Sequence, residues 1–480
     1  MKDIFLFTLV IFGFLFAEAQ QKQPWSLNEI IIKAQSQSPK FKLAQTQKEI
    51  SYYQYLSFKS DYKPQISFYG NAPVYNKEYF GVRQPDGTIK YQSISQNNSN
   101  IGLGLSQQLL FSGGELSLNT DLARFDDFRA KTKQYSGTPV YLRLSQPLFA
   151  VNELKWRKKI EPLKLEESKR EFIQEMENIA QQATSLYFDV LDALNNMEMA
   201  KANLQNTQTN YKIEKKRVNL GTTTEDKLLQ LELQTLRNEQ DLENAKYDFQ
   251  IAQLDLKTFI GIKTDEELNL FEPQKTPVLV VRLSEAFDYA RKNRAEFIVF
   301  ERKINEAKRD VALAKAAKHQ INLVASYGLN NVGENIGKIY QTPNDQQRFN
   351  VGFDIPIVDW GRRKARYNTA KAIEKLTATT NEFEEAIIYQ EIMTLVKNIE
   401  LLKSNITLAE KTDSVAQRRF TIANNLYHVG KLSVIELNLA QLEKDNARRT
   451  YINALRAYWN AYYLLRRLTM YDFENNKSLF

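Results

Sequence analysis

The dominant pattern along the chain is a three-four alternation of apolar residues that continues for dozens of positions. In the first half it runs from Phe172 to Leu204 and resumes from Leu242 to Phe259. In the second half it runs from Ile392 to Ala409 and resumes from Ala447 to Leu465. Such a heptad seam is typical of α-helices that lie side by side over their whole length. We therefore expect two hairpins of very long helices.

Glycine and proline, which interrupt helices, are sparse in the same regions. The chain has 480 residues but only 17 Gly and 12 Pro. Neither residue occurs in 163–220, 222–260, 362–429 or 431–480. At about 1.5 Å per residue, the span 362–429 would extend roughly 100 Å as a helix. No compact globular domain needs such a helix, so the chain is not a series of ordinary domains.

A single glycine divides each long helical pattern. Gly221 and Gly430 stand where a left-handed residue is expected after a helix C-terminus. A capping box, Ser433-x-x-Glu436, follows the second glycine, and a weaker one, Thr223-x-x-Asp226, follows the first. Each box predicts that a new helix begins there, so each half should contain an antiparallel helical hairpin with a tight tip.

Between the helical regions the apolar period changes from three-four to two. The alternation is clear from Phe349 to Ile357, from Ile101 to Leu105 and from Val140 to Leu144. One apolar and one small or polar face is typical of a strand between lipid and water. A soluble sheet packed on the helices would show the same alternation. The export signal described below and the absence of another large sheet favour the membrane.

The two halves of the sequence resemble each other. Leu27-Asn28-Glu29 and Leu283-Ser284-Glu285 open similar amphipathic stretches, to about Asp61 and Lys318. Pro147 corresponds to Pro356 and Gly221 to Gly430, both at an offset of 209 residues. We interpret this as a tandem duplication. The predicted divisions are a first repeat over 20–271 with strands in about 64–149 and a tip near 218–224, a linker over 272–282, a second repeat over 283–471 with strands in about 319–358 and a tip near 427–433, and a tail over 472–480.

The first half is longer in its strand region. The strand end Ser106–Phe111 resembles Ser145–Phe149, which predicts an additional strand pair at about 112–146. Four to six strands cannot close around a water-filled lumen, and open strand edges are not tolerated in lipid. Identical chains would therefore have to share one barrel with cyclic symmetry. Three chains would build 12 strands if the additional pair projects and 18 if it joins the wall, and both alternatives stay open here.

The N-terminus resembles an export signal. Lys2 precedes an apolar run over Ile4–Phe16, and the small-x-small sequence at residues 17–19 predicts a signal peptide over 1–19. A buried N-terminal helix is the less favoured alternative, because the polar segment 20–23 follows at once. Removal of the peptide changes the formal charge from +8 to +9. No later segment reaches the 18 or so apolar residues of a membrane-spanning helix.

The composition offers little chemistry. There is no Cys, which excludes a thiol enzyme, a Cys-ligated metal site and disulfides. His319 and His428 have no further ligand at metal-binding spacing, so we expect no cofactor, no metal and no catalytic site. His428 stands at a predicted tip, where solvation is expected. Basic residues are interleaved with acidic ones throughout, and export would remove nucleic acid as a partner.

Taken together, the pattern resembles the TolC family of outer-membrane efflux and export ducts over about residues 24–470. The similarity lies in the duplicated layout, the strand end Ser145–Phe149, the helix start Asp359–Arg363 and the tip Tyr427–Gly430. The resemblance implies a mainly α fold with membrane β, in which a trimeric outer-membrane β-barrel continues into a long periplasmic coiled-coil barrel. It also implies a Gram-negative outer membrane, a periplasmic adaptor (membrane fusion) protein, and an inner-membrane RND or ABC transporter.

The same resemblance implies site residues. The adaptor-docking tips would be Leu220-Gly221-Thr222 and Val429-Gly430-Lys431, and the periplasmic gate would involve Tyr427 and Glu436. Leu432 and Leu439 depart from the family pattern, because the family can place an Arg and an acidic residue there. The predicted function is a passive duct of a tripartite efflux pump or a type I secretion system. The alternative is a periplasmic adaptor or scaffold, although an adaptor would have one hairpin rather than two in tandem. The transported substance is not predicted.

Overall fold

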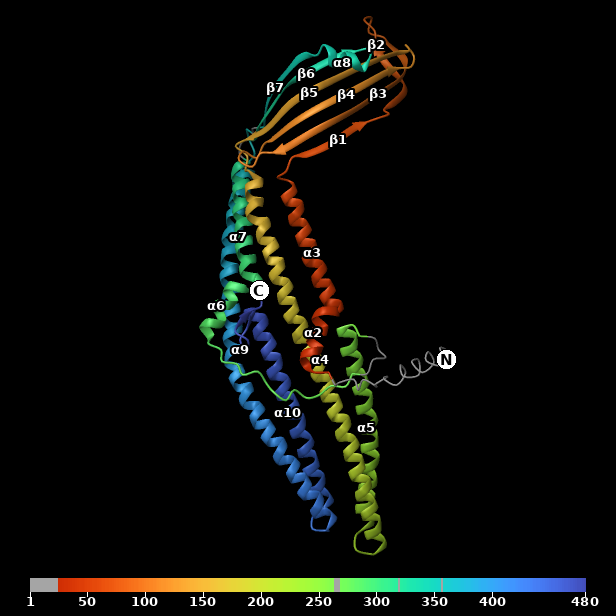
Figure 1. Ribbon diagram of the computed structural model, residues 1–480, viewed down its shortest axis with the longest axis vertical. Coiled ribbons are helices and arrows are strands. Elements are labelled where there is room, and N and C mark those ends of the chain that lie inside the picture. The colour runs from red at the N-terminus through yellow and green to blue at the C-terminus, as the bar shows by residue number, and fades with distance from the viewer. Residues whose placement is uncertain (1–24, 263–267, 318–319, 355–356) are drawn as a thin grey trace, which may run out of the picture. The chain divides into compact units, whose positions relative to one another are not determined.

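The computed structural model describes residues 25–262, 268–317, 320–354 and 357–480. The predicted signal peptide, His319 and Pro356 lie outside the described residues. The chain divides into two compact units, whose elements are labelled in Figure 1. The first unit comprises residues 1–46, 171–294 and 389–480, and the second comprises residues 47–170 and 295–388.

The first unit is built from paired helices. It contains α2 (Leu27–Gln37), α5 (Glu225–Ile260), α6 (Leu283–Asn293), α10 (Val434–Thr469), and the C-terminal parts of α4 (Glu153–Asn219) and α9 (Arg362–His428). α4 and α5 form one hairpin, and α9 and α10 form the other, as the two heptad patterns predicted. The short strands β8 (Tyr471–Asp472) and β9 (Lys477–Ser478) pair at the C-terminus.

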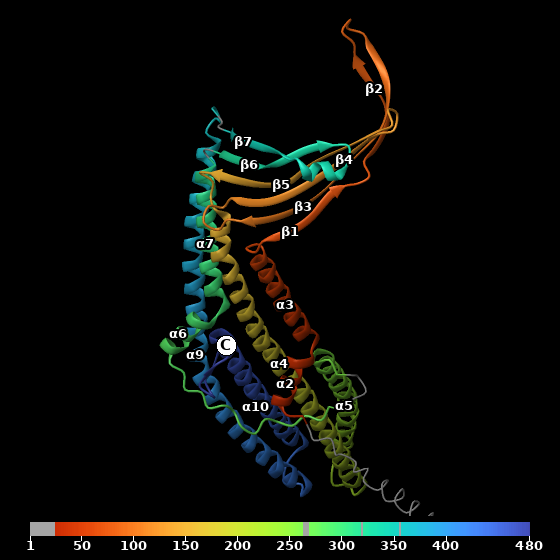
Figure 2. The ribbon, with the colours of Figure 1, turned by 45° about the horizontal axis from the view of Figure 1, so that its top comes forward.

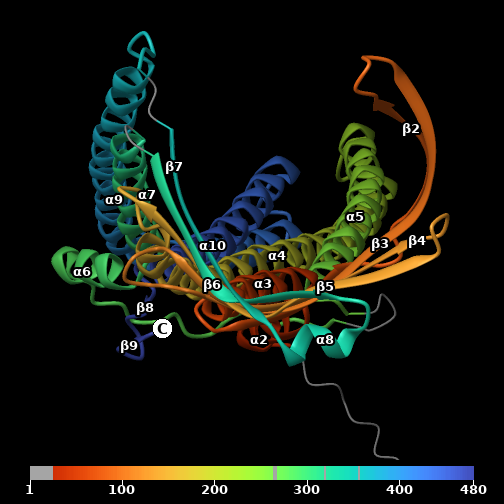
Figure 3. The same ribbon diagram turned by 90° about the horizontal axis from the view of Figure 1, so that it is seen from above.

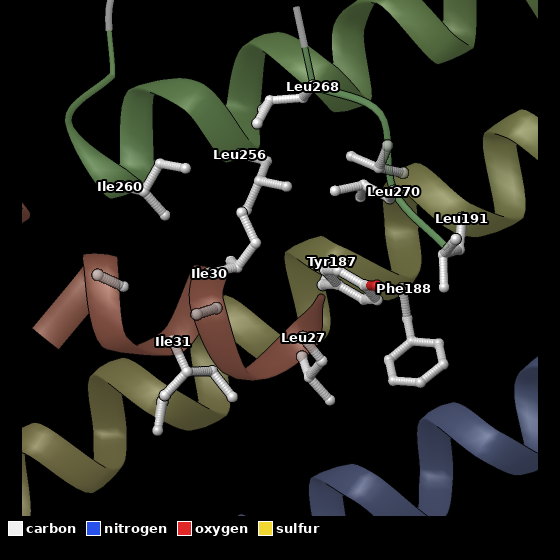
Figure 4. Close-up of a cluster of buried hydrophobic side chains, with 14 of the residues drawn as sticks. Leu27, Ile30, Ile31, Tyr187, Phe188, Leu191, Leu256, Ile260, Leu268 and Leu270 are labelled. Atoms are coloured by element: carbon white, nitrogen blue, oxygen red, sulfur yellow. The ribbon is translucent and has the colours of Figure 1, made fainter. Parts of the chain in front are cut away.

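A hydrophobic cluster joins α2, α4, α5 and the segment after α5 within this unit (Figure 4). Ile30, Tyr187, Leu256 and Ile260 are fully buried in it. The Tyr187 hydroxyl donates a hydrogen bond to the backbone carbonyl of Phe271. Burial of each such side chain contributes about 1.5–3 kcal/mol. The cluster therefore fixes α2 and the chain after α5 against the first hairpin.

The second unit contains the sheet. Its helices are most of α3 (Pro39–Ser60), α7 (Ala295–Ala316), the short α8 (Ile336–Gln341), and the N-terminal parts of α4 and α9. Its strands are β1 (Gln65–Asn71), β2 (Tyr75–Arg83), β3 (Ile89–Gln108), β4 (Glu115–Asp127), β5 (Thr132–Leu148), β6 (Gln320–Gly333) and β7 (Asn344–Asp354). The antiparallel order is β1-β3-β4-β5-β6-β7, and β2 pairs with β3 alone. Figure 3 shows the strands from above as a curved layer.

The period-two alternation separates the two faces of the sheet. One row in register runs Ile66, Leu105, Leu118, Leu142 and Tyr327 across β1, β3, β4, β5 and β6. All five side chains are exposed in the single chain. The neighbouring row on the other face is small or polar: Ser67, Gly104, Asn119, Tyr141, Gly328 and Gln346. The sheet thus presents an exposed apolar face and a polar face, as the alternation predicted.

Corresponding helices of the two halves have equal lengths. α2 and α6 have 11 residues each, and α3 and α7 have 22 each. α4 and α9 have 67 residues each, and α5 and α10 have 36 each. The strand region lies between α3 and α4 in one half and between α7 and α9 in the other. The order and lengths agree with the proposed repeat.

The amphipathic stretches predicted to run unbroken are interrupted in both halves. α2 ends before Ser38, whose ψ of 153° is extended. Pro39 follows, and the residue before a proline is disfavoured in the helical region. α6 ends before Arg294, with ψ 146°, although no proline follows there. Each predicted stretch is therefore a short helix followed by a longer one. Among the described helices, none combines the length and apolar character needed to cross a membrane.

Candidate functional site at the helical tips

The two hairpin tips have the same backbone geometry. Gly221 has φ +71° and Gly430 has φ +75°, both in the left-handed region. The Thr222 amide donates to the Arg217 carbonyl, and the Lys431 amide donates to the Leu426 carbonyl, each at 2.9–3.0 Å. These bonds close the last turn of α4 and of α9 as in a Schellman motif. The sequence prediction of glycine-terminated tips is correct at both positions.

Within the first unit, the side chain of Arg217 links the first tip to the second. Its Nη2 donates to the backbone carbonyls of Tyr427 at 3.1 Å and His428 at 3.0 Å. These carbonyls lie at the C-terminus of α9, where helical carbonyls lack intrahelical partners and a positive charge is favourable. His428 Nε2 also lies 3.1 Å from Asn210 Oδ1 on α4. The two hairpins are therefore joined at their ends, and His428 has a polar partner where the sequence predicted only solvent.

A buried carboxylate, Glu214, lies at the centre of this junction. Its Oε2 accepts from Arg217 Nη1 and from the Tyr427 hydroxyl, both at 3.1 Å. Its Oε1 accepts from the Thr223 hydroxyl at 2.7 Å. Burial would raise the pKa of this carboxyl, but the hydrogen bonds from Thr223, Tyr427 and Arg217 outweigh burial and hold the pKa below its usual value. Glu214 is therefore charged at neutral pH.

The weaker predicted capping box at Thr223 is not formed. α5 begins at Glu225, and its N-cap is Thr224, which makes no side-chain cap bond. Because the helix begins one residue later than the motif requires, the Thr223 hydroxyl lies outside the cap position. It donates to Glu214 instead. The predicted box at Ser433 is correct, with both reciprocal bonds present.

The two predicted gate residues have different environments. Tyr427 is buried in a cluster at the second tip, made by Leu231, Phe420, Ala423, Val434, Leu437 and Ala440. Burial raises the pKa of the Tyr427 hydroxyl, and the Glu214 charge adds to the rise. Glu436 is exposed, and its Oε2 accepts from the Ser433 amide at 3.0 Å and from the Ser433 hydroxyl at 2.8 Å. The backbone bond and then the hydroxyl bond from Ser433 lower the pKa of the Glu436 carboxyl.

A groove of about 450 Å³ runs beside Glu436 between α9 and α10. Leu432 and Leu439, the two positions that depart from the family pattern, line the groove with Glu436. Ile422 and Leu426 line it from α9. The surroundings of Glu436 in the single chain are thus largely apolar.

An exposed apolar stripe follows the tip-proximal half of α9. Leu401, Leu408, Val415, Ile422 and Val429 recur every seven residues, and each is 57–66% exposed. The buried side of α9 has its own stripe, which includes Ile399, Ala409 and Phe420. We call the exposed set the α9 seam. It has the spacing of a coiled-coil contact but no partner among the described residues.

A second exposed stripe follows α5. Leu233, Gln240, Tyr247 and Leu254 recur every seven residues and are exposed, whereas Leu231, Asn238 and Ala245 on the same helix are buried. We call the exposed set the α5 seam. α5 carries eight Asp or Glu against four Lys or Arg. The stretch 401–429 carries four Lys or Arg against two Asp or Glu. The two seams therefore differ in the sign of their flanking charge.

Sequence reasoning missed Glu214, Arg217 and Asn210. Each lies in an amphipathic helix where a solvated polar residue is the default expectation. Their partners at Tyr427 and His428 are more than 200 residues away, so no local spacing identifies the pairs. A search of the described residues finds no group of three His, Cys, Asp or Glu able to hold a metal ion.

The sequence matches the family described as Outer membrane efflux protein over residues 126–262 and 287–469. The chain therefore belongs to the outer membrane efflux protein family, whose members are outer-membrane channels rather than enzymes. It is an outer-membrane channel-tunnel component for efflux, located in the outer membrane and projecting into the periplasm. The predicted TolC-type family is confirmed. The periplasmic scaffold alternative is not favoured.

Solved structures of several outer-membrane channels share the fold. The outer membrane protein VceC of Vibrio cholerae is 16% identical with a TM-score of 0.65, covering 92% of this chain and 95% of that one. The CmeC outer membrane channel of Campylobacter jejuni is 14% identical with a TM-score of 0.66, covering 92% and 85%. The open MtrE outer membrane channel of Neisseria gonorrhoeae is 17% identical with a TM-score of 0.63, covering 92% and 88%. No curated protein sequence matches the chain.

Proposed function

We propose that three copies of this chain assemble into a passive duct that leads from the periplasm to the cell exterior. The observation that carries the proposal is the sheet, which has an exposed apolar face and two edge strands with one neighbour each. A single such sheet encloses no passage, and open edges are not tolerated in lipid. Copies related by cyclic symmetry would pair the edges and enclose a shared barrel. Its apolar face would contact outer-membrane lipid, and its polar face would line the lumen.

The helical seams support the same assembly. The α9 seam and the α5 seam lie on different hairpins, so one copy can present its α9 seam to the α5 seam of the next. This contact is heterologous, and a ring of such contacts closes. Arg217 joins both tips within a chain, so α9 descends to the tip level from which α5 of the neighbour rises. The neighbouring helices would therefore pack antiparallel, with basic α9 against acidic α5.

The tips would dock a periplasmic adaptor protein, through which an inner-membrane RND or ABC transporter delivers its cargo. Leu220, Gly221, Thr222, Val429, Gly430 and Lys431 form these tips. Leu220 and Val429 are exposed apolar side chains at the two turns. An adaptor could cover both at once, because the tips are joined by Arg217. Whether the system performs efflux of small molecules alone or also secretes proteins depends on that transporter.

The gate would lie at the same end. Three copies of Glu436 near a common axis would concentrate negative charge at the entrance, and Tyr427 would hold each second tip in place through Glu214. The cap that Glu436 forms with Ser433 is compatible with this role, because the cap fixes the carboxylate at the start of α10. The equal helix lengths support the further proposal that the chain arose by tandem duplication.

The seam contact provides the test of assembly, because the natural chain has no Cys. Counted from the tips, Leu408 of one copy stands level with Tyr247 of the next. The double variant Leu408→Cys with Tyr247→Cys should form disulfides between copies, giving a ladder that ends at the covalent trimer. The pair Leu408→Cys with Asp241→Cys, on another side of α5, is the matched control. A ladder that continues beyond three, or equal cross-linking of both pairs, would contradict the proposal.

A further inference from the structure

The additional strand pair predicted at about 112–146 lies inside the sheet. It corresponds to β4 and β5, which occupy the interior of the strand order between β3 and β6. β4 pairs with β3 from Gln96↔Asp127 to Gln108↔Glu115. β5 pairs with β6 from Tyr135↔Gly333 to Leu148↔Ile321. Both strands of the pair therefore have a neighbour on each side, so the pair does not project from the sheet.

The part that does project is a different hairpin. β2 pairs only with residues Ile89–Asn97 of β3 and lies off the main strand path. Figure 2 shows β2 and the start of β3 extending beyond the other strands. A meander with β2 counted as a wall strand would have an odd number of strands. Without β2 the wall has six: β1, β3, β4, β5, β6 and β7.

The pair also continues the two faces of the sheet. Leu118 and Leu142 extend the apolar row between Leu105 and Tyr327. Asn119 and Tyr141 extend the polar row on the other face. A strand pair between lipid and water needs this alternation, whereas a projecting hairpin does not. β4 and β5 are therefore suited in length, register and polarity to be part of a wall.

We propose that each chain contributes six strands to the shared wall, so that three copies enclose 18 strands and not 12. The inference rests on the trimeric duct proposed above. The surface that joins the copies is β7 of one chain against β1 of the next, because these are the strands with a free edge. Six is an even number, so this junction is antiparallel like the other pairings in the sheet. The occupant of each free edge is thus a second copy of this chain.

The larger strand number widens the passage. With strands about 4.8 Å apart and tilted by about 40°, a wall of 18 strands measures roughly 36 Å between opposite backbones, against roughly 24 Å for 12 strands. The lumen cross-section more than doubles. Its polar face carries Tyr141, Arg143, Gln346 and Arg348, which keep the passage hydrated. The cargo this end admits is therefore bulky hydrated solutes, wider than those a 12-stranded wall would pass.

Disulfide trapping in intact outer membranes tests the strand order. The variant Leu142→Cys with Tyr327→Cys joins β5 to β6 and should form an intrachain disulfide. The matched variant Leu105→Cys with Tyr327→Cys should not, because those strands lie three positions apart in an 18-stranded wall, about 14 Å. If the pair projected, β3 would lie beside β6, and the second disulfide would form in place of the first. That result would overturn the inference.

Electron cryomicroscopy of the trimer in lipid nanodiscs gives the second measurement. The inference expects a wall near 36 Å between backbones, and exclusion of polyethylene glycols added on the external side only at correspondingly larger polymer sizes. A trimer with a wall near 24 Å would overturn the six-strand inference and leave the proposed duct intact. Absence of any trimer would overturn the proposed duct itself. The two failures are therefore distinguishable.

Discussion

At the scale of single residues, the hairpin tips depend on one buried charge. Glu214 accepts hydrogen bonds from Thr223, Tyr427 and Arg217, and Arg217 in turn binds the end of α9. A buried carboxylate is costly unless it is paired and hydrogen-bonded, and here both conditions are met. The position of the second tip against the first is therefore sensitive to the charge state of Glu214.

Replacing Glu214 should loosen the second tip. Glu214→Gln removes the charge that holds Arg217, and loss of such a charged hydrogen bond costs about 1.5–3 kcal/mol. We expect amide hydrogen exchange at residues 425–431 to accelerate about tenfold or more. Glu232→Gln, at an exposed position on α5, is the control and should leave these amides unchanged. Equal exchange rates in Glu214→Gln and the unmodified protein would contradict this role.

The same network predicts a pH dependence. The folded pKa of Glu214 lies below the ordinary value of 4.5, so its stabilising contribution is fully present above pH 4.5. That contribution is lost as the pH falls through the lower folded pKa. Protection at residues 425–431, corrected for intrinsic exchange rates, should decrease in this acid range for the unmodified protein. In Glu214→Gln it should be flat.

Glu436 offers a separate test of the gate. Glu436→Gln keeps the shape of the side chain and can still accept the bonds from Ser433, but it removes the proposed ring of charge. Because Ser433 lowers the pKa of Glu436, the carboxylate is charged at neutral pH in the natural chain. Trimers in planar bilayers should lose cation selectivity and block by periplasmic multivalent cations in the variant. If both persist, Glu436 is a helix cap and the gate lies elsewhere.

At the scale of elements, the long helices were the most predictable part of the chain. Heptad spacing and the absence of Gly and Pro identified both hairpins and placed both tips at the observed glycines. Pro162 shows the limit of that criterion, because α4 continues through it. Interior proline removes one helical hydrogen bond, and packing of neighbours such as the buried Ile160 compensates. Side-chain links between distant helices, including those of Glu214 and Arg217, have no local sequence signal and were not predictable.

The tip glycines are required by their backbone conformation rather than by crowding. A Cβ added at Gly221 would have no neighbouring atom within 4 Å, and one added at Gly430 would have only Arg217 Nη2, at 3.8 Å. A side chain would therefore fit, but the left-handed conformation costs about 1–2 kcal/mol for most residues. Asn tolerates this conformation better than a β-branched residue.

Gly430→Val should therefore disturb the tip without preventing assembly. We expect the trimer to form but the recovery of the periplasmic adaptor, measured by cross-linking in intact cells, to fall severalfold. Gly430→Asn is the matched control and should retain most of the adaptor. Loss of the trimer in Gly430→Val would show that the glycine serves assembly rather than docking.

At the scale of the whole molecule, the fold is retained at 14–17% identity to channels such as VceC, CmeC and MtrE. The pattern that survives is the period of apolar positions and the order of elements, which is why the family was predictable from a single sequence. The additional strand pair was also predicted, but its place was not. Sequence similarity between the strand ends at 106–111 and 145–149 identifies a pair, whereas only the pairing of β3, β4, β5 and β6 shows that it lies within the sheet.

The central claim is that the chain functions as a trimer in the outer membrane. Its most direct test is native mass spectrometry of the protein extracted from purified outer membranes. We predict an assembly with three times the mass of the processed chain, recovered from the outer-membrane fraction. Recovery of a soluble periplasmic monomer would contradict the account.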